Sequence, residues 1–266
     1  MIHPTAVVYS GAQLDPTVEV GAYAVIDAQV TLGPGCRVGP FVHLTGVTTV
    51  GASNVFHPGA VIGDAPQDLK YKDAPTRLRI GDGNIFREHV TVHRSNKLEE
   101  DTVIGAHGFY MAHAHIAHNC QLGDGVMMAN GATLGGHVCV EDRAFISGNC
   151  LVHQFVRVGT LAMMQGGSAI SKDLAPFTVA HENNNACGLN IVGLRRAGFS
   201  PAERLELKQL YRFLFREGRP LRAAATEALG LFTGAPAQRM LAFIVASKRG
   251  VVAHPAAAQG ENEAEE

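Results

Sequence analysis

The chain has 266 residues and a mass of 28.2 kDa, which allows one large domain or one large and one small domain. Charged residues make up 17%, aromatic residues only 6%, and glycine is abundant at 30, so small and aliphatic side chains must build the core. The net charge of −2 gives no case for nucleic-acid binding. No apolar stretch reaches the roughly 18 residues that a transmembrane helix needs.

Features that would direct the chain out of the cell are missing from the sequence. The N-terminus, Met1-Ile2-His3-Pro4, has neither a basic region nor an apolar segment, so we expect no signal peptide. Five cysteines without a framework spacing indicate a reducing compartment rather than a disulfide scaffold. We therefore expect a cytoplasmic protein without a transmembrane segment.

A period of six residues runs through the first two thirds of the chain. Large apolar residues occupy every sixth position in two long runs. The first run is Ile2, Val8, Leu14, Val20, Ile26, Leu32, Val38, Leu44, Val50, Phe56 and Ile62, and the second is Ile104, Tyr110, Ile116, Leu122, Met128, Leu134, Val140, Ile146, Val152, Val158, Met164 and Ile170. This period fits neither a helix nor simple alternation, and it predicts one short strand and one turn per hexad, stacked as a parallel β-helix.

Interruptions of the period predict where the chain leaves the coil. The register is lost for about 17 residues after Ile62 and again over Arg94–Asp101. We expect a β-helix over residues 1–184, with protruding loops near 65–79 and 93–102. Three cysteines fall on the small, inward positions of the hexads and are expected to pack rather than react; they are Cys36, Cys120 and Cys150.

The pattern changes to helical spacing toward the C-terminus. Ser200-Pro201-Ala202-Glu203 is a capping box with proline at the first helical position, and Gly218 is a stop signal. We expect an α-helical domain over 185–250, with further helices over 222–229 and 237–247. Residues 251–266 are rich in Ala, Glu and Gln and are expected to be disordered.

The helical region carries an excess of positive charge. Residues 195–249 contain 11 Lys and Arg against 4 Asp and Glu, whereas residues 1–194 contain 11 against 16. A basic module suggests an acidic partner. On charge alone, a solvated helical face with spare arginine side chains explains the excess at least as well.

Histidines concentrate in the coil. The chain has 13, and the densest segment contains His113, His115 and His118. Such residues can be solvated or stacked side chains on a coil face, zinc ligands, or a general base with a pKa near neutrality. Metal sites of this kind of coil need three convergent histidines, and no carboxylates accompany these in a recognisable spacing, so we expect no metal.

The segment Ala114-His115-Ile116-Ala117-His118-Asn119-Cys120 resembles the active-site motif of the UDP-N-acetylglucosamine O-acyltransferases, a family of hexapeptide-repeat acyltransferases. Further motifs agree in the same order, and they are Ile62-Gly63-Asp64-Ala65-Pro66-Gln67-Asp68-Leu69-Lys70-Tyr71, Ile80-Gly81-Asp82-Gly83-Asn84, Val90-Thr91-Val92-His93-Arg94, Gly135-Gly136-His137, Val152-His153-Gln154-Phe155 and Gly188-Leu189-Asn190-Ile191-Val192-Gly193-Leu194-Arg195-Arg196. The resemblance covers about residues 1–250. It implies an all-β, left-handed parallel β-helix followed by a small α-helical C-terminal domain.

The resemblance also implies an activity. Members of the family transfer a (3-hydroxy)acyl chain from acyl carrier protein to the 3-position of UDP-N-acetylglucosamine, the first step of lipid A biosynthesis. The donor carries the chain on 4′-phosphopantetheine, and no cofactor is bound to the enzyme. The family forms homotrimers and meets the acidic carrier protein transiently.

Site residues follow from the matched motifs. His118 would be the general base, and the backbone N–H of Gly136 would stabilise the oxyanion. Gly166 matches the floor of the family's acyl-chain ruler, where a missing side chain admits a long chain. The remaining matches would bind substrate, and they are Gln67, Asp68, Lys70, His93, His115, His137, His153, Gln154, Asn190 and Arg196.

Three positions depart from the family pattern. Asn119 stands where an aspartate usually follows the catalytic histidine, and an amide can fix the tautomer of His118 but cannot stabilise an imidazolium by charge. Val192 stands where an acid is usual, and Ala197 where a second arginine is usual. These changes bear on the acceptor and nucleotide contacts.

Alternative functions remain open at this point. A related hexapeptide acyltransferase could use an acyl-CoA donor or acylate a UDP 3-amino sugar. A metal-dependent hydratase of the carbonic anhydrase type shares the coil, and zinc analysis would separate it. A structural or ice-binding coil predicts regular threonine faces and no interrupting loops, which this sequence contradicts.

Overall fold

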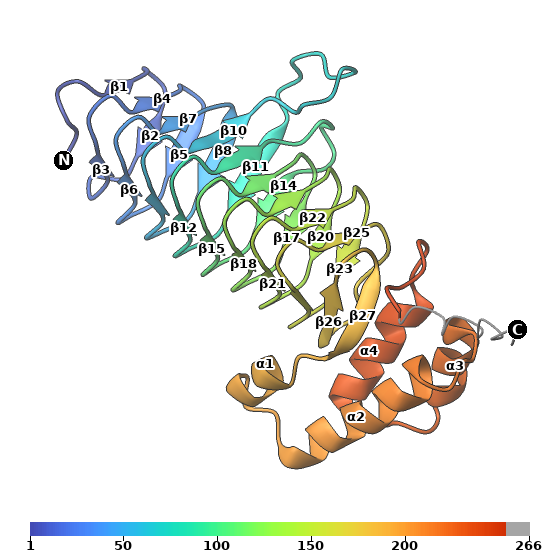
Figure 1. Cartoon of the computed structure of the whole chain (residues 1–266). Helices are drawn as coiled ribbons and strands as arrows, with labels where there is room; N and C mark the ends of the chain where they lie inside the picture. Colours follow the sequence, from blue (N-terminus) through green and yellow to red (C-terminus); the bar gives the residue numbers. More distant parts are fainter. Residues whose placement is uncertain (254–266) are drawn as a thin grey trace, which may run out of the picture.

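The computed structural model describes residues 1–253 and has the form of an elongated coil of short strands with helices at one end (Figure 1). Three sheets form the faces of the coil, and neighbouring strands within a sheet come from successive turns. Val7 pairs with Val25 and Val8 with Ile26, so one turn takes 18 residues, as three hexads require. The fold is a left-handed parallel β-helix, which confirms the expected class.

The strands are distributed over the three faces as follows. The first sheet contains β1 (Val7–Val8), β4 (Val25–Ile26), β7 (His43–Leu44), β10 (Val61–Asp64), β13 (Thr91–His93), β16 (His115–Ile116), β19 (Thr133–Leu134), β22 (Leu151–Val152) and β25 (Ala169–Ile170). The second sheet contains β2 (Gln13–Leu14), β5 (Val30–Leu32), β8 (Val47–Val50), β11 (Arg77–Ile80), β14 (Thr102–Ile104), β17 (Gln121–Leu122), β20 (Cys139–Val140) and β23 (Arg157–Val158). The third sheet contains β3 (Glu19–Val20), β6 (Arg37–Val38), β9 (Val55–Phe56), β12 (Ile85–Phe86), β15 (Phe109–Tyr110), β18 (Met127–Met128), β21 (Phe145–Ile146), β24 (Met163–Met164), β26 (Thr178–His181) and β27 (Asn185–Leu189).

The second residue of most strands is one of the large apolar residues that recur at every sixth position, which we call hexad leaders, and it points into the coil. Ile26, Leu44 and Ile116 are completely buried, and so are small residues such as Ala24 that turn the corners between sheets. Burying a side chain of this size contributes about 1.5–3 kcal/mol, so the repeated leaders supply most of the stability of the coil. Because the first residue of each two-residue strand points outward, that position is free to carry function.

Two loops leave the coil between turns. Val61 pairs with Thr91, 30 residues later, and Leu78 pairs with Thr102, 24 residues later, so these two turns carry extra residues beyond the usual 18. The extra residues form the loops 65–76 and 94–101, close to the expected ranges; Figure 1 shows the larger one standing away from the coil. The Asn96 side chain donates to Asp68 at 2.9 Å and joins the two loops.

The helices are α1 (Ile191–Arg196), α2 (Pro201–Phe215), α3 (Leu221–Ala228) and α4 (Ala235–Val245). At the start of α2, the Ser200 Oγ accepts from the Glu203 N–H at 3.2 Å, and the Glu203 carboxylate accepts from the Ser200 N–H at 2.7 Å, which confirms the capping box. The helices share a core with Leu161 and Phe177 of the coil. None of the helices within residues 1–253 is long and apolar enough to cross a membrane.

Both expected boundaries of the helical region move. Residues 185–189 form strand β27, antiparallel to β26, so the first helix begins only at Ile191. At the other end, Val251 pairs with Asp173 and Val252 is 1% exposed, so the disordered tail expected from residue 251 does not include 251–253. Two consecutive valines bury apolar surface there, which the Ala- and Glu-rich composition of the whole segment concealed. Residues 254–266 lie outside the described part of the chain.

Candidate active site

A cleft of about 740 Å³ lies on the outer face of the first sheet. Its floor is a ladder of outward side chains from successive turns, in which His115, Thr133, Leu151 and Ala169 are paired in register. Seven of the predicted site residues line this cleft, and they are Gln67, His93, His115, His118, Gly136, His153 and Gln154. Residues that are far apart in the sequence meet here because each turn of the coil advances the chain by only one strand spacing.

Gly136 and His118 lie against each other in the middle of the cleft. Gly136 is buried, and a Cβ atom at this position would lie 2.7 Å from Cε1 and 2.8 Å from Nε2 of the His118 ring. Only glycine therefore allows this imidazole its position. Among the hydrogen bonds within residues 1–253, none uses the Gly136 N–H, so this buried donor is available to a ligand.

Asn119 holds the His118 ring from its other side. His118 Nδ1 lies 2.8 Å from Oδ1 of Asn119. An amide oxygen is only an acceptor, so Nδ1 carries the proton and Nε2 keeps a lone pair. The His118 and His137 rings are perpendicular, with their centroids 5.2 Å apart, and His137 stacks on Phe155 at a centroid distance of 4.7 Å.

The neighbouring imidazoles are held in their neutral form. Burial, reinforced by His115, lowers the pKa of His93 to about 4. Burial and the adjacent His118 lower the pKa of His115 and of His137. Neutral imidazoles can donate through one nitrogen and accept through the other, which suits the recognition of sugar hydroxyl groups.

The loop 65–76 brings a carboxylate toward these rings. Asp68 accepts hydrogen bonds from the Lys70 N–H at 2.9 Å and from the Asn96 side chain at 2.9 Å, and both lower the pKa of its carboxyl group. The Lys70 side chain is exposed. Asp68 is thus ionised and oriented at the edge of the cleft that Gln67 lines.

Six predicted site residues do not line this cleft: Asp68, Lys70 and His137 lie beside residues that do, whereas Asn190, Arg196 and Gly166 lie elsewhere in this chain. Asn190 caps α1, because its Oδ1 accepts from the Gly193 N–H at 2.9 Å and its Nδ2 donates to the Leu161 carbonyl at 2.9 Å. Arg196 is exposed on the same helix. Gly166 is exposed in the turn between β24 and β25, three residues before Ala169 of the cleft. Of the departures from the family pattern, Val192 is 57% exposed and Ala197 ends α1.

Several residues around His118 were not predicted from the sequence. Ser95, Asn96 and Glu100 of the loop 94–101 surround the Asn119 side chain. The break in the hexads over this segment was the available signal, because a break marks residues that are released from packing. Asn183 and Asn184 close the far end of the cleft and follow the last complete turn, where no period remains to identify them.

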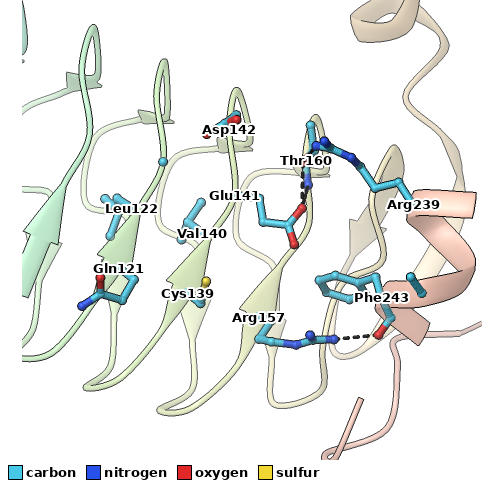
Figure 2. A pocket seen from close by; sticks show the side chains of 12 residues that line it. Gln121, Leu122, Cys139, Val140, Glu141, Asp142, Arg157, Thr160, Arg239 and Phe243 are labelled. Carbon is cyan, nitrogen blue, oxygen red and sulfur yellow. Dashed lines mark hydrogen bonds between the residues drawn. The ribbon is translucent and has the colours of Figure 1, made fainter. Parts of the chain in front are cut away.

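A second hollow of similar size lies between the second sheet and α4 (Figure 2). Its polar groups satisfy one another: Arg157 donates to the Phe243 carbonyl at 2.7 Å, and Thr160 donates to Glu141 at 2.7 Å. This hollow is a junction between coil and helices rather than a reactive site. No group of three or more His, Cys, Asp or Glu side chains within residues 1–253 is arranged to hold a metal ion.

Comparisons with known proteins agree over almost the whole chain. Residues 173–252 match a family model described as UDP N-acetylglucosamine O-acyltransferase, domain 2. The chain is 43% identical over 259 residues to the acyl-[acyl-carrier-protein]–UDP-N-acetylglucosamine O-acyltransferase of Herminiimonas arsenicoxydans, covering 95% of this chain and 99% of the relative. The enzyme of the same name from Verminephrobacter eiseniae is 46% identical, with 94% and 98% covered. Among solved structures, the UDP-N-acetylglucosamine acyltransferase from Campylobacter jejuni superposes with a TM-score of 0.91 at 35% identity, covering 96% of this chain and 100% of that one.

Proposed function

The chain belongs to the UDP-N-acetylglucosamine O-acyltransferase family, and we propose that His118 and Gly136 perform its reaction. The protein is an acyltransferase that transfers an acyl chain from acyl carrier protein to UDP-N-acetylglucosamine in lipid A biosynthesis. The observation that carries the assignment of these two residues is their contact, which puts a ring nitrogen with a free lone pair beside a backbone N–H that has no hydrogen-bond partner within residues 1–253.

The reaction proceeds in two steps on these groups. Nε2 of His118 removes the proton from the 3-hydroxyl of the sugar while the oxygen attacks the thioester carbonyl, and the Gly136 N–H donates to the oxyanion that forms. The C–S bond then breaks, the thiolate of the pantetheine leaves, and it receives the proton held by His118. The products are the acyl ester of the sugar nucleotide and the free thiol of the carrier protein, without a covalent enzyme intermediate and without a metal.

The acidic carrier protein would dock on the helical domain. A hollow of about 470 Å³ at the start of α2 has the apolar side chains Leu189, Ile191 and Leu205 in its lining. Three cations, Arg195, Arg204 and Lys208, stand around it. Positive charge beside an apolar surface suits an acidic protein that delivers a long chain, because charge steers the encounter while apolar contact holds it.

A homotrimer would complete the site. The outward positions of the third sheet form an apolar ladder, in register, over Ile85, Phe109, Met127, Phe145 and Met163. Parallel sheets are normally covered on both faces, so this ladder calls for a partner surface. A neighbouring copy that covered it could also bring Asn190 and Arg196 to the cleft of the first copy, which this chain's own fold does not do.

Two smaller assignments accompany this proposal. The protein would work in the cytoplasm, where acyl carrier protein is loaded with its acyl chain. The five free cysteine thiols of this protein stay reduced in that compartment. It would bind no cofactor of its own, since the pantetheine arrives on the donor.

The test is mass spectrometry of the products formed from UDP-N-acetylglucosamine and from a UDP 3-amino sugar, each with a ladder of acyl carrier proteins. The proposal predicts a 3-O-acyl product of UDP-N-acetylglucosamine with one preferred chain length. Faster acylation of the amino sugar would move the enzyme to N-acylation. Turnover with acyl-CoA at the rate seen with the carrier protein would contradict the docking role of the helical domain.

A further inference from the structure

The Asn119 side chain is the centre of a fully occupied set of hydrogen bonds. Its Oδ1 accepts from His118 Nδ1 at 2.8 Å and lies 3.0 Å from the donating Asn96 N–H. Its Nδ2 donates to Ser95 Oγ at 2.7 Å and to Oε2 of Glu100 at 3.1 Å. An amide group has two acceptor sites and two donor hydrogens, so no further partner can be added.

Two of these partners have fixed roles and therefore determine which way the amide faces. The backbone N–H of Asn96 can only donate, and the ionised carboxylate of Glu100 can only accept. A flipped amide would point its NH₂ group at the Asn96 N–H and its oxygen at the Glu100 carboxylate. Because both contacts would then be repulsive, the oxygen must face His118, and the His118 proton must sit on Nδ1.

Glu100 is kept ionised by its own surroundings. Lys97 donates to it at 3.0 Å and the Asn119 amide donates as well, and both lower the pKa of its carboxyl group. Its Oε2 also lies 3.8 Å from Nδ1 of His137, whose ring is perpendicular to the His118 ring. The side chain is 47% exposed, so its electrostatic effect is screened and its orienting effect is the larger one.

We propose that Glu100 is a positioning residue for the acyl transfer, acting through Asn119 on the tautomer of His118. This role rests on the proposed function of His118. The carboxylate that usually follows the catalytic histidine in the family is here replaced by an amide, and Glu100 lies one hydrogen bond farther out along the same chain of contacts. The loop 94–101 therefore supplies the part that the substitution of Asn119 for aspartate removes.

A set of variants at position 100 tests the role. Glu100→Ala removes the acceptor and should lower kcat about three- to tenfold with a smaller change in KM, because the amide gains freedom to turn away from the productive orientation. Glu100→Gln keeps an acceptor oxygen and should therefore retain most of the wild-type kcat. Glu99→Ala is the matched control, since Glu99 is an exposed neighbour that takes no part in these hydrogen bonds.

The second readout is nitrogen NMR of the His118 ring, which does not depend on turnover. The wild-type protein should show the Nδ1–H form, and Glu100→Ala should show a mixture of the two neutral tautomers. A wild-type kcat together with an unchanged ring spectrum in Glu100→Ala would overturn the proposal, as would an equal effect of Glu99→Ala. If the wild-type protein transferred no acyl chain to any sugar nucleotide, the proposed function would fail while the ring spectrum still tested the contact.

Exchanging the amide of Asn119 and the carboxylate of Glu100 in a double variant separates a coupling between the two residues from a general loss of structure. Asn119→Asp alone places two carboxylates at hydrogen-bond distance and should lower kcat. Adding Glu100→Gln allows the introduced amide to donate to the introduced carboxylate, and we expect at least a threefold recovery. Asp tolerates the positive φ of 58° at this position about as well as Asn, so the backbone should remain in place. If Glu100→Gln had the same effect in both backgrounds, the two residues would be uncoupled and the proposal would be wrong.

Discussion

The Cα of Gly136 faces the His118 ring so closely that a single added Cβ would lie 2.7 Å from Cε1. This contact joins the proposed base to the proposed oxyanion donor, since the two residues belong to adjacent turns of the coil. A displacement of either one therefore disturbs both.

Gly136→Ala should lower kcat by about a hundredfold or more and leave the coil folded. The added methyl group has to push the imidazole out of line with the attacking hydroxyl and narrows access to the backbone N–H. Gly148→Ala is the matched control, because among residues 1–253 its Cβ would meet only the Asn130 carbonyl oxygen, at an ordinary 3.4 Å. Steady-state kinetics and circular dichroism of both variants check this prediction, and comparable losses in the two would contradict it.

Gly166→Met should shift the preference of the enzyme toward shorter acyl chains. Each buried methylene contributes about 0.8 kcal/mol, so a side chain that displaces several of them should discriminate against a fourteen-carbon donor relative to a ten-carbon donor by about a hundredfold. In the part of the chain that the structure describes, a Cβ at Gly166 would meet only the Gly148 carbonyl oxygen, at 3.5 Å, so the variant should fold.

The control for chain length is Gly230→Met, which enters open space in the helical domain. The measured quantity is the ratio of kcat/KM for the two donors. A ratio that did not change in Gly166→Met would place the end of the acyl site elsewhere.

Reversing charge at Arg204 and Lys208 should raise the KM for acyl carrier protein. Both side chains lie beside the hollow at the start of α2. Replacing them with acidic residues removes the electrostatic attraction that steers an acidic protein to this surface. A small pantetheine thioester does not need that surface, so its kcat/KM should stay unchanged. Equal losses with both donors would mean that the residues act on folding or chemistry instead.

Stability should fall as the pH is lowered from about 6.5 toward 4, because burial lowers the pKa of His93 to about 4 from a usual 6.5. Between these pH values the unfolded chain binds a proton that the folded chain does not, so protonation stabilises the unfolded state and lowers the free energy of unfolding. His93 alone should reduce the free energy of unfolding at pH 5 by about 2 kcal/mol relative to pH 7.5.

His93→Gln should lessen this loss, because a neutral amide does not titrate. Urea unfolding at the two pH values, at one protein concentration, measures the difference. The groups around the ring are His115, His118, Asp64 and Arg94, and they remain the same in the variant. A pH dependence identical to that of the wild-type protein would show that the His93 ring is not the group responsible.

The coil could be predicted from the sequence because its period is a direct record of packing. Each hexad leader, such as Ile26 or Ile116, fills the equivalent space in its own turn. A buried apolar residue therefore recurs at a fixed period, whatever residues stand between. The capping box at Ser200 could also be predicted from the sequence, because its two interacting side chains are only three residues apart. Strand β27 and the return of Val251 to the coil were not predicted, because their partners are distant in the sequence and follow no period.

The site divides along the same line. His118 and Gly136 belong to motifs that resemble those of the family, and the cleft contains both. Glu100 has no motif, and only folding of the loop 94–101 brings it to Asn119. Asn190 and Arg196 belong to the motifs but lie outside this chain's cleft, since a motif records which residue is present and not where the fold places it.

The most direct test of the account is the turnover of His118→Ala with saturating substrates. A general base contributes roughly 10²–10⁴-fold, so we expect a loss in that range with the fold and the oligomeric state unchanged. His43→Ala is the control, since His43 occupies an outward position of the first sheet away from the cleft and should keep wild-type activity. A loss below about tenfold in His118→Ala would contradict the assignment of His118 as the base.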